Sequence, residues 1–189
     1  MKRSIQDYLS LGYLYLLALG VIRDTVYYGF LDINIMSYTS ILDVLLSPLV
    51  FLTKNIYIPV IIAVLIIGMW FLSRYLRRLN AKSENKGKVK LQISENNFAV
   101  LMVALVVFSM YFGAGLGQGQ AISERIEENR LDPTHRLRFV NDKSDISVRL
   151  LGQNSQYLFF IAPGDSSVSI VPINGNIRRL TRLESLYKD

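Results

Sequence analysis

The segment that most constrains the fold is Phe98–Gly119, which reads FAVLMVALVVFSMYFGAGLGQG. It opens with about fourteen uncharged, mostly aliphatic residues, enough to form most of a helix that crosses a bilayer. It closes with glycine at every second position, namely Gly113, Gly115, Gly117 and Gly119. Because glycine lets a second backbone approach closely, we expect this segment to join a membrane bundle to the region that follows it.

Apolar residues gather in three blocks, and we expect these to span the membrane over residues 9–31, 56–75 and 98–117. Each block approaches the roughly 20 residues that a transmembrane helix needs. A fourth apolar stretch, residues 40–52, contains Asp43 and a proline. It is too short to span the membrane, so we expect a re-entrant or interfacial half-helix. Asp43 is either an acid of its first turn or a vestibule acid of a pore.

Positive charge is concentrated in a loop that we expect over residues 74–97. Seven Lys and Arg residues fall within residues 74–90, against a single acid, Glu84. The positive-inside rule places this loop in the cytoplasm. With three spans, the N-terminus is then cytoplasmic and the chain after Gly119 lies outside the cytoplasm. The basic loop favours contact with anionic lipid. A nucleic-acid or nucleotide contact is the alternative, although the sequence gives no argument for stable DNA binding.

Arg23 and Asp24 interrupt the first apolar block. A charge at membrane depth usually faces a bundle interior or water. Adjacent helical residues point about 100° apart, so we expect that the two side chains do not face one partner. Two interpretations remain open. The pair lies near the membrane surface beside an aromatic belt, or it is a buried polar pair joined to another helix or subunit.

The sequence divides into a transmembrane helical domain, residues 1–119, and a soluble domain, residues 120–189. The soluble part begins with a polar helix, and a proline at position 133 ends it. Short alternating segments separated by turn residues follow, and they predict a small antiparallel β-barrel or sandwich. We expect five strands, over residues 136–140, 146–151, 156–162, 167–173 and 176–182. The predicted fold class is thus a membrane α-helical bundle with a small C-terminal all-β domain.

Three further groups of residues are candidates for function. The glycine run contains two overlapping GxxxG patterns, which serve packing within one bundle, contact between copies, or a pore lining or gate. The acids Glu124, Glu127 and Glu128 form a solvated helix face, or ring the mouth of an oligomer and favour cations. Arg178, Arg179 and Arg182 form a solvated strand face or bind an anion or other ligand.

Several kinds of chemistry have no support in the sequence. The chain has no cysteine and one histidine, which excludes thiolate chemistry and Cys- or His-cluster metal sites. No combination of nucleophile, base and acid recurs at membrane depth. We therefore expect no enzymatic activity, no cofactor and no metal site.

Two stretches carry a resemblance to known proteins. Residues 27–43, reading YYGFLDINIMSYTSILD, and residues 151–160, reading LGQNSQYLFF, are similar to segments of small bacterial inner-membrane proteins. Some proteins of this layout act as membrane effectors in anti-phage defence, where an oligomer permeabilises or depolarises the inner membrane. The resemblance implies a multi-pass protein of the bacterial inner membrane. It leaves a nucleotide or oligonucleotide signal open as a partner.

These observations lead to two expectations for function. The first is a homo-oligomeric membrane protein, in contact with the bilayer and with itself, that forms or gates an ion pathway. The second is a non-conducting sensor or adaptor whose β domain binds a partner protein or a nucleotide.

Overall fold

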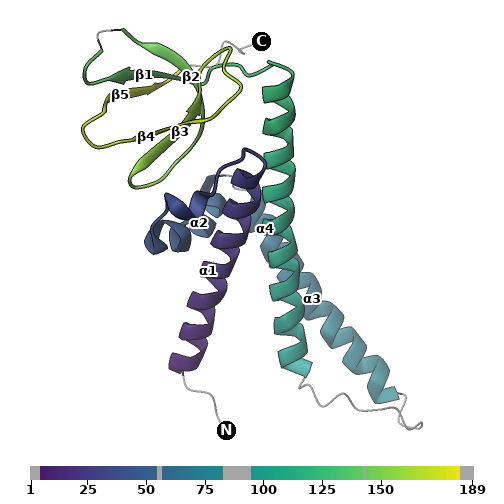
Figure 1. Cartoon of the computed structure of the whole chain (residues 1–189). Helices are drawn as coiled ribbons and strands as arrows, with labels where there is room; N and C mark the ends of the chain where they lie inside the picture. The colour runs from purple at the N-terminus through teal and green to yellow at the C-terminus, as the bar shows by residue number, and fades with distance from the viewer. Residues whose placement is uncertain (1–4, 55–56, 83–94, 143, 184–189) are drawn as a thin grey trace.

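The computed structural model describes residues 5–54, 57–82, 95–142 and 144–183, and Figure 1 shows their arrangement. The described chain begins with helices and ends with strands. The helical elements are α1 (Ile5–Gly29), the 3-10 turn η1 (Ile35–Ser37), α2 (Ile41–Lys54), α3 (Tyr57–Lys82) and α4 (Glu95–Glu127).

Two of these helices, α1 and α4, are long and apolar enough to cross a membrane. The segments Ile41–Thr53 and Tyr57–Gly68 meet at 89° and together qualify as one broken span or a re-entrant loop. Only 11% of the residues in the most apolar window of α1, and of α4, are buried within the protomer. Exposed aliphatic surface on this scale is stable against lipid rather than water. The two to three candidate spans mark the chain as a membrane protein.

Two of the helices run in the same direction at the centre of the molecule. In Figure 1, α1 and α4 lie side by side and both rise toward the sheet, α3 descends, and α2 lies across them. The N-terminal ends of α1 and α4 and the C-terminal end of α3 therefore lie at the end opposite the sheet. A core of Leu19, Phe51 and Tyr111 joins α1, α2 and α4. The Tyr111 hydroxyl donates to the carbonyl of Pro48 in this core, at 2.9 Å.

Two helices extend further than the sequence predicts. α3 continues to Lys82, so Arg74 and the basic residues after it begin in a helix and not in a loop; residues 83–94 of the expected loop lie outside the described chain. α4 remains helical through the whole glycine run and on to Glu127. Glycine costs about 1 kcal/mol against alanine in a helix in water, but in lipid an open backbone would leave polar groups unsatisfied. The glycine run is therefore a continuous part of the α4 helix.

The C-terminal region is a five-stranded antiparallel sheet in the order β4-β3-β2-β1-β5. It consists of β1 (His135–Phe139), β2 (Ile146–Gln153), β3 (Tyr157–Ile161), β4 (Ser169–Pro172) and β5 (Ile177–Arg182). The sheet is open, with β4 and β5 as its edges, where we expected a closed barrel or a sandwich. It nevertheless bends around one core, because buried Leu137, Val148, Leu158 and Phe160 pack with apolar residues of β4 and β5.

The outer face of β3 docks the sheet on the helices. Phe159 is fully buried and packs against Tyr28, with ring centroids 5.0 Å apart. The Tyr27 hydroxyl donates to the Leu151 carbonyl at 3.2 Å. The β2–β3 pairing shifts register between Leu150 and Gly152, next to the place where Tyr28 contacts the sheet. A Cβ at Gly152 would lie 2.1 Å from the Tyr28 hydroxyl oxygen, so the docking requires glycine there.

Substituting Gly152 tests this docking. Gly152→Ala should lower the free energy of unfolding by about 1–3 kcal/mol, because the new methyl overpacks the contact with Tyr28. Tyr28→Phe removes the oxygen that the methyl would meet, so the double variant should be less destabilised than the two single effects added together. Thermal unfolding in detergent measures both. Gly12→Ala is the matched control, since nothing lies within 4 Å of the corresponding Cβ. Simple additivity in the double variant would contradict the proposed contact.

Candidate functional site

The glycine run of α4 faces two ways. A Cβ at Gly115 would lie 2.9 Å from the Arg23 carbonyl oxygen, and a Cβ at Gly119 would lie 2.6 Å from the Phe30 ring. These two glycines therefore form the seam on which α1 and α4 pack. Cβ atoms at Gly113 and Gly117 would have nothing within 4 Å. One GxxxG pattern is thus used inside the protomer, while the other lies on an exposed face of α4.

A third glycine joins α1 to α2. A Cβ at Gly20 would lie 2.1 Å from the Val44 carbonyl oxygen, a distance that no side chain tolerates. Pro48 stands four residues after Val44 and has no N–H, so this carbonyl lacks the donor it would have in a regular helix. The carbonyl points at the glycine, and α2 lies against the backbone of α1.

Arg23 and Asp24 lie at this junction, within the candidate span of α1. Arg23 Nη1 donates to Asp24 Oδ1 at 2.7 Å, and the exposed fractions of the two side chains are 17% and 13%. The Arg23 guanidinium also lies over the Phe51 ring, 4.7 Å from its centroid, and the Ser47 hydroxyl bonds Asp24. Both residues thus face α2, although the sequence analysis expected them to face different partners. The long arginine side chain bends back to make this possible.

The same cluster reaches α4. Arg23 Nη2 donates to Gln118 Oε1 at 3.4 Å, which is a long contact. The Arg23 Nε atom is buried and has no hydrogen-bond partner among the described residues. Of the two interpretations of the pair, the geometry matches the one in which it is joined to other helices.

Asp43 acts as a structural acid at the start of α2. Its Oδ2 accepts from the Ser40 hydroxyl at 2.6 Å. Oδ2 also accepts from the Ser40 N–H at 3.3 Å, while the Asp43 N–H donates to the Ser40 hydroxyl at 3.1 Å. This reciprocal pair is a capping box. The carboxylate also accepts from the Ser155 hydroxyl, at 2.8 Å, and from the Ser155 N–H, at 3.2 Å. The carboxylate therefore joins the β2–β3 turn to α2. Its four hydrogen bonds match the interpretation of Asp43 as an acid of the first helical turn.

The three acids at the end of α4 go to three different environments. Glu124 accepts from the Gln120 amide at 2.9 Å. Glu128 pairs with Arg130 at 2.8 Å on the exposed surface. Glu127 lines a cavity between the sheet and the helices. Within one protomer the three carboxylates therefore do not converge on a single ion.

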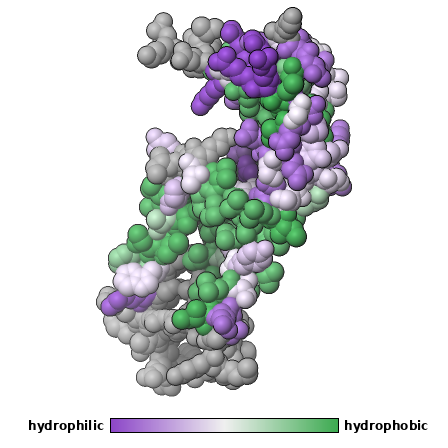
Figure 2. Space-filling model, turned by 90° about the vertical axis from the view of Figure 1, so that its left-hand side faces the viewer, coloured by the Kyte–Doolittle hydropathy of each residue, from purple (hydrophilic) through white to green (hydrophobic). Residues whose placement is uncertain are grey.

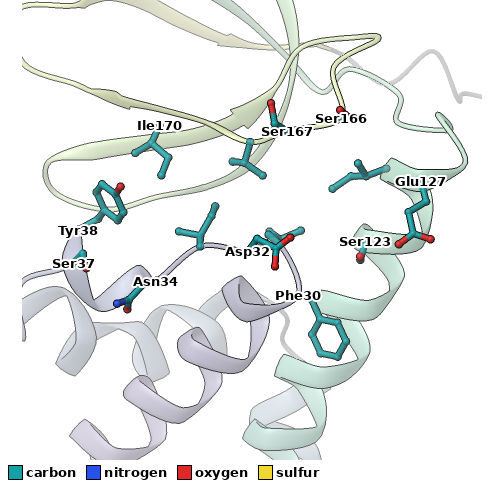
Figure 3. Close-up of a pocket in the computed structure, with 14 residues that line it drawn as sticks. Phe30, Asp32, Asn34, Ser37, Tyr38, Ser123, Glu127, Ser166, Ser167 and Ile170 are labelled. Carbon is teal, nitrogen blue, oxygen red and sulfur yellow. The ribbon is translucent and has the colours of Figure 1, made fainter.

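That cavity has a volume of about 560 Å³ and lies beneath the β3–β4 loop (Figure 3). Its floor is apolar, while Asp32, Glu127 and several hydroxyls line its sides. None of the described side chains that line it is basic, so its electrostatics favour a cation over an anion. Within the described parts of the chain, no three His, Cys, Asp or Glu residues are grouped as metal ligands.

The C-terminal arginines lie far from this junction. Arg178, Arg179 and Arg182 are on β5, the edge strand at the end of the sheet remote from the helices (Figure 1). Arg179 lies directly opposite Arg138 of β1. The structure therefore adds the arginines of β1 to a group that the sequence analysis confined to β5.

Sequence reasoning missed Gly20, Gly152 and Gln118. Gly20 and Gly152 are single glycines without a motif, and only the partner that each one contacts identifies it. Gln118 could have been predicted as a contact residue, because a polar side chain in a membrane helix usually has a partner. No protein-family model, no curated protein and no solved structure matches this chain.

Removing one charge of the buried pair should destabilise the junction. Asp24→Asn leaves Arg23 without its anion, and we expect the free energy of unfolding to fall by about 3–5 kcal/mol. The double variant Arg23→Met, Asp24→Leu removes both charges and should recover most of that loss. Denaturant titration in detergent measures each value.

Glu128→Gln serves as the control, because it breaks an exposed ion pair and should change stability by less than about 1 kcal/mol. If Asp24→Asn proved equally mild, the pair would not be a buried structural pair.

Proposed function

We propose that the chain is a homo-oligomeric membrane protein that forms or gates an ion pathway, with α4 of each copy packed against a neighbouring copy. One observation carries this proposal: among the described residues, nothing lies within 4 Å of a Cβ placed at Gly113 or Gly117. Ser109, Gly113, Gly117 and Ala121 are exposed and recur every four residues along α4, so they form one stripe on the helix. We call these four residues the small-residue stripe.

The glycines of the small-residue stripe lower helix propensity, and no contact within the described protomer offsets that loss. In lipid, helices associate chiefly by close packing, and small residues allow the backbones to approach. Gly115 and Gly119 serve this purpose against α1. Gly113 and Gly117 carry the same helix penalty with no gain inside the protomer. Packing of a second copy on the small-residue stripe supplies the missing gain.

The polar side chains of α4 supply the proposed pathway. Gln118, Gln120 and Glu124 are exposed within the candidate span, residues 100–127. Such groups are costly in hydrocarbon and usually face water or protein. In an oligomer centred on α4, Gln120 and Glu124 would surround the outer mouth, with Glu124 biasing it toward cations.

The proposed orientation follows from charge. The basic end of α3, which includes Arg74, lies opposite the sheet (Figure 1), and the positive-inside rule assigns that end to the cytoplasm. The sheet then lies outside the cytoplasm. We base two further proposals on the resemblance alone: that the membrane is a bacterial inner membrane, and that the protein is a membrane-disrupting defence effector. A nucleotide or oligonucleotide trigger is a proposal on the same basis.

A non-conducting sensor is the second candidate, and the cavity of about 560 Å³ between sheet and helices favours it. A ligand held there would touch both layers and so report on their relative position. Ion flux separates the two candidates, because a sensor would bind without conducting.

Placing bulk on the stripe tests the first proposal. Gly113→Leu should leave the protomer folded, because its side chain points into open space, but should weaken assembly and reduce ion flux in liposomes at least tenfold. Chemical crosslinking in the same liposomes should lose its higher bands. Gly12→Leu is the matched control, since Gly12 of α1 is equally free of contacts and should leave both readouts unchanged.

Two results would count against the proposal. Wild-type liposomes without flux across a series of lipid compositions and membrane potentials would remove the ion pathway. Equal effects of Gly113→Leu and Gly12→Leu would remove the special role of the stripe.

A further inference from the structure

Five exposed or half-exposed arginines gather on the two strands furthest from the membrane helices. They are Arg136 and Arg138 of β1 with Arg178, Arg179 and Arg182 of β5. Arg136, Arg138 and Arg179 share one face of the sheet, and we call these three residues the arginine surface. Figure 2 shows a dense hydrophilic patch at this end of the molecule, well separated from the hydrophobic band over the helices.

The sheet register places part of this charge on one face. Leu137 and Leu180 are paired and pack into the core inside the bend of the sheet. Because side chains alternate along a strand, the neighbouring Arg136, Arg138 and Arg179 lie on the outer face. Arg138 and Arg179 are direct cross-strand partners, an arrangement that is destabilising for like charges.

Asp145 is a carboxylate that contacts this face. Asp145 accepts from Arg138 Nε at 2.5 Å. That hydrogen bond, together with the charges of Arg179 and Arg136, lowers the pKa of the Asp145 carboxyl. From His135 to Arg182 the sequence has seven basic residues and three acids, so the excess of positive charge remains.

The lone histidine lies beside this surface, near Arg182 and Arg149. Partial burial and the charges of Arg182 and Arg149 lower the pKa of His135. The cause is electrostatic in part, so an anion bound nearby would raise this pKa again. His135 is the only histidine of the chain, and it is therefore a clean spectroscopic reporter.

The shape of the arginine surface selects the kind of anion. Arg136 and Arg138 are two residues apart on one strand, which separates them by about 7 Å along the sheet, and Arg179 of β5 lies directly beside Arg138. Charges spread in this way contact successive anionic groups of a chain better than a single ion. The remaining outer-face residues of these strands and their neighbour include Ser147 and Thr181 and no aromatic ring, so there is no platform on which bases would stack.

We propose that the arginine surface binds the charged backbone of an extended polyanion. Arginine forks recognise phosphate and similar oxyanions, and several such contacts along one chain add together through counterion release. This site is separate from the proposed ion pathway, since it lies on strands of the sheet and not on the membrane helices. Its occupancy can be tested even if the protein conducts no ions.

The test uses the full chain in nanodiscs of zwitterionic lipid, with long-chain polyphosphate as the probe. Binding should be lost steeply as salt rises. Arg179→Gln should weaken binding about fivefold and lower the slope of log affinity against log salt by about one. Arg125→Gln changes the net charge equally but lies on α4, and should leave both values unchanged. Bound polyphosphate should also raise the pKa of His135, measured by NMR.

Further probes define the class of ligand. Inorganic phosphate at the same phosphate concentration should bind far more weakly, because it makes one contact at a time. Single-stranded DNA matched in phosphate number should bind no more tightly than polyphosphate. The proposal is overturned if polyphosphate does not bind, if Arg125→Gln weakens it as much as Arg179→Gln, or if DNA is strongly preferred.

Discussion

The close approach of other backbones to the second half of α1 is the constraint on which the protomer depends. α2 reaches α1 at Gly20, where the Val44 carbonyl leaves no room for a side chain. α4 reaches it through Gly115 and Gly119, and the sheet reaches it through Tyr27 and Tyr28. All three contacts fall within the last ten residues of one helix. The charged pair Arg23–Asp24 lies among them and is satisfied largely by the elements that these contacts bring together.

Much of the architecture could be predicted from the sequence, because the bilayer imposes strong rules. Long apolar runs must be helical in lipid. Segments in which polar and apolar residues alternate between turn residues predict strands. The prediction of a helical membrane region followed by a small antiparallel β region is confirmed. The open edges of the sheet were not predicted. Closure depends on whether β4 and β5 pair with each other, and no local sequence pattern indicates whether they do.

The candidate site was harder to predict, for a physical reason. Alternating glycines predict close packing but do not identify the partner helix. Only the structure shows that Gly115 and Gly119 face α1 while Gly113 and Gly117 are exposed. Asp43 carried the same ambiguity until Ser40 and Ser155 were seen to supply its hydrogen bonds. Cross-strand neighbours such as Arg138 and Arg179 are 41 residues apart, beyond the reach of any periodicity.

The central claim is that α4 carries two packing faces, one for α1 and one for another copy of the chain. Native mass spectrometry of the wild-type protein released from lipid nanodiscs measures this most directly. The account predicts one discrete assembly of two or more copies that persists as the protein-to-lipid ratio is lowered. A single copy at every ratio, with the protomer intact, would contradict it.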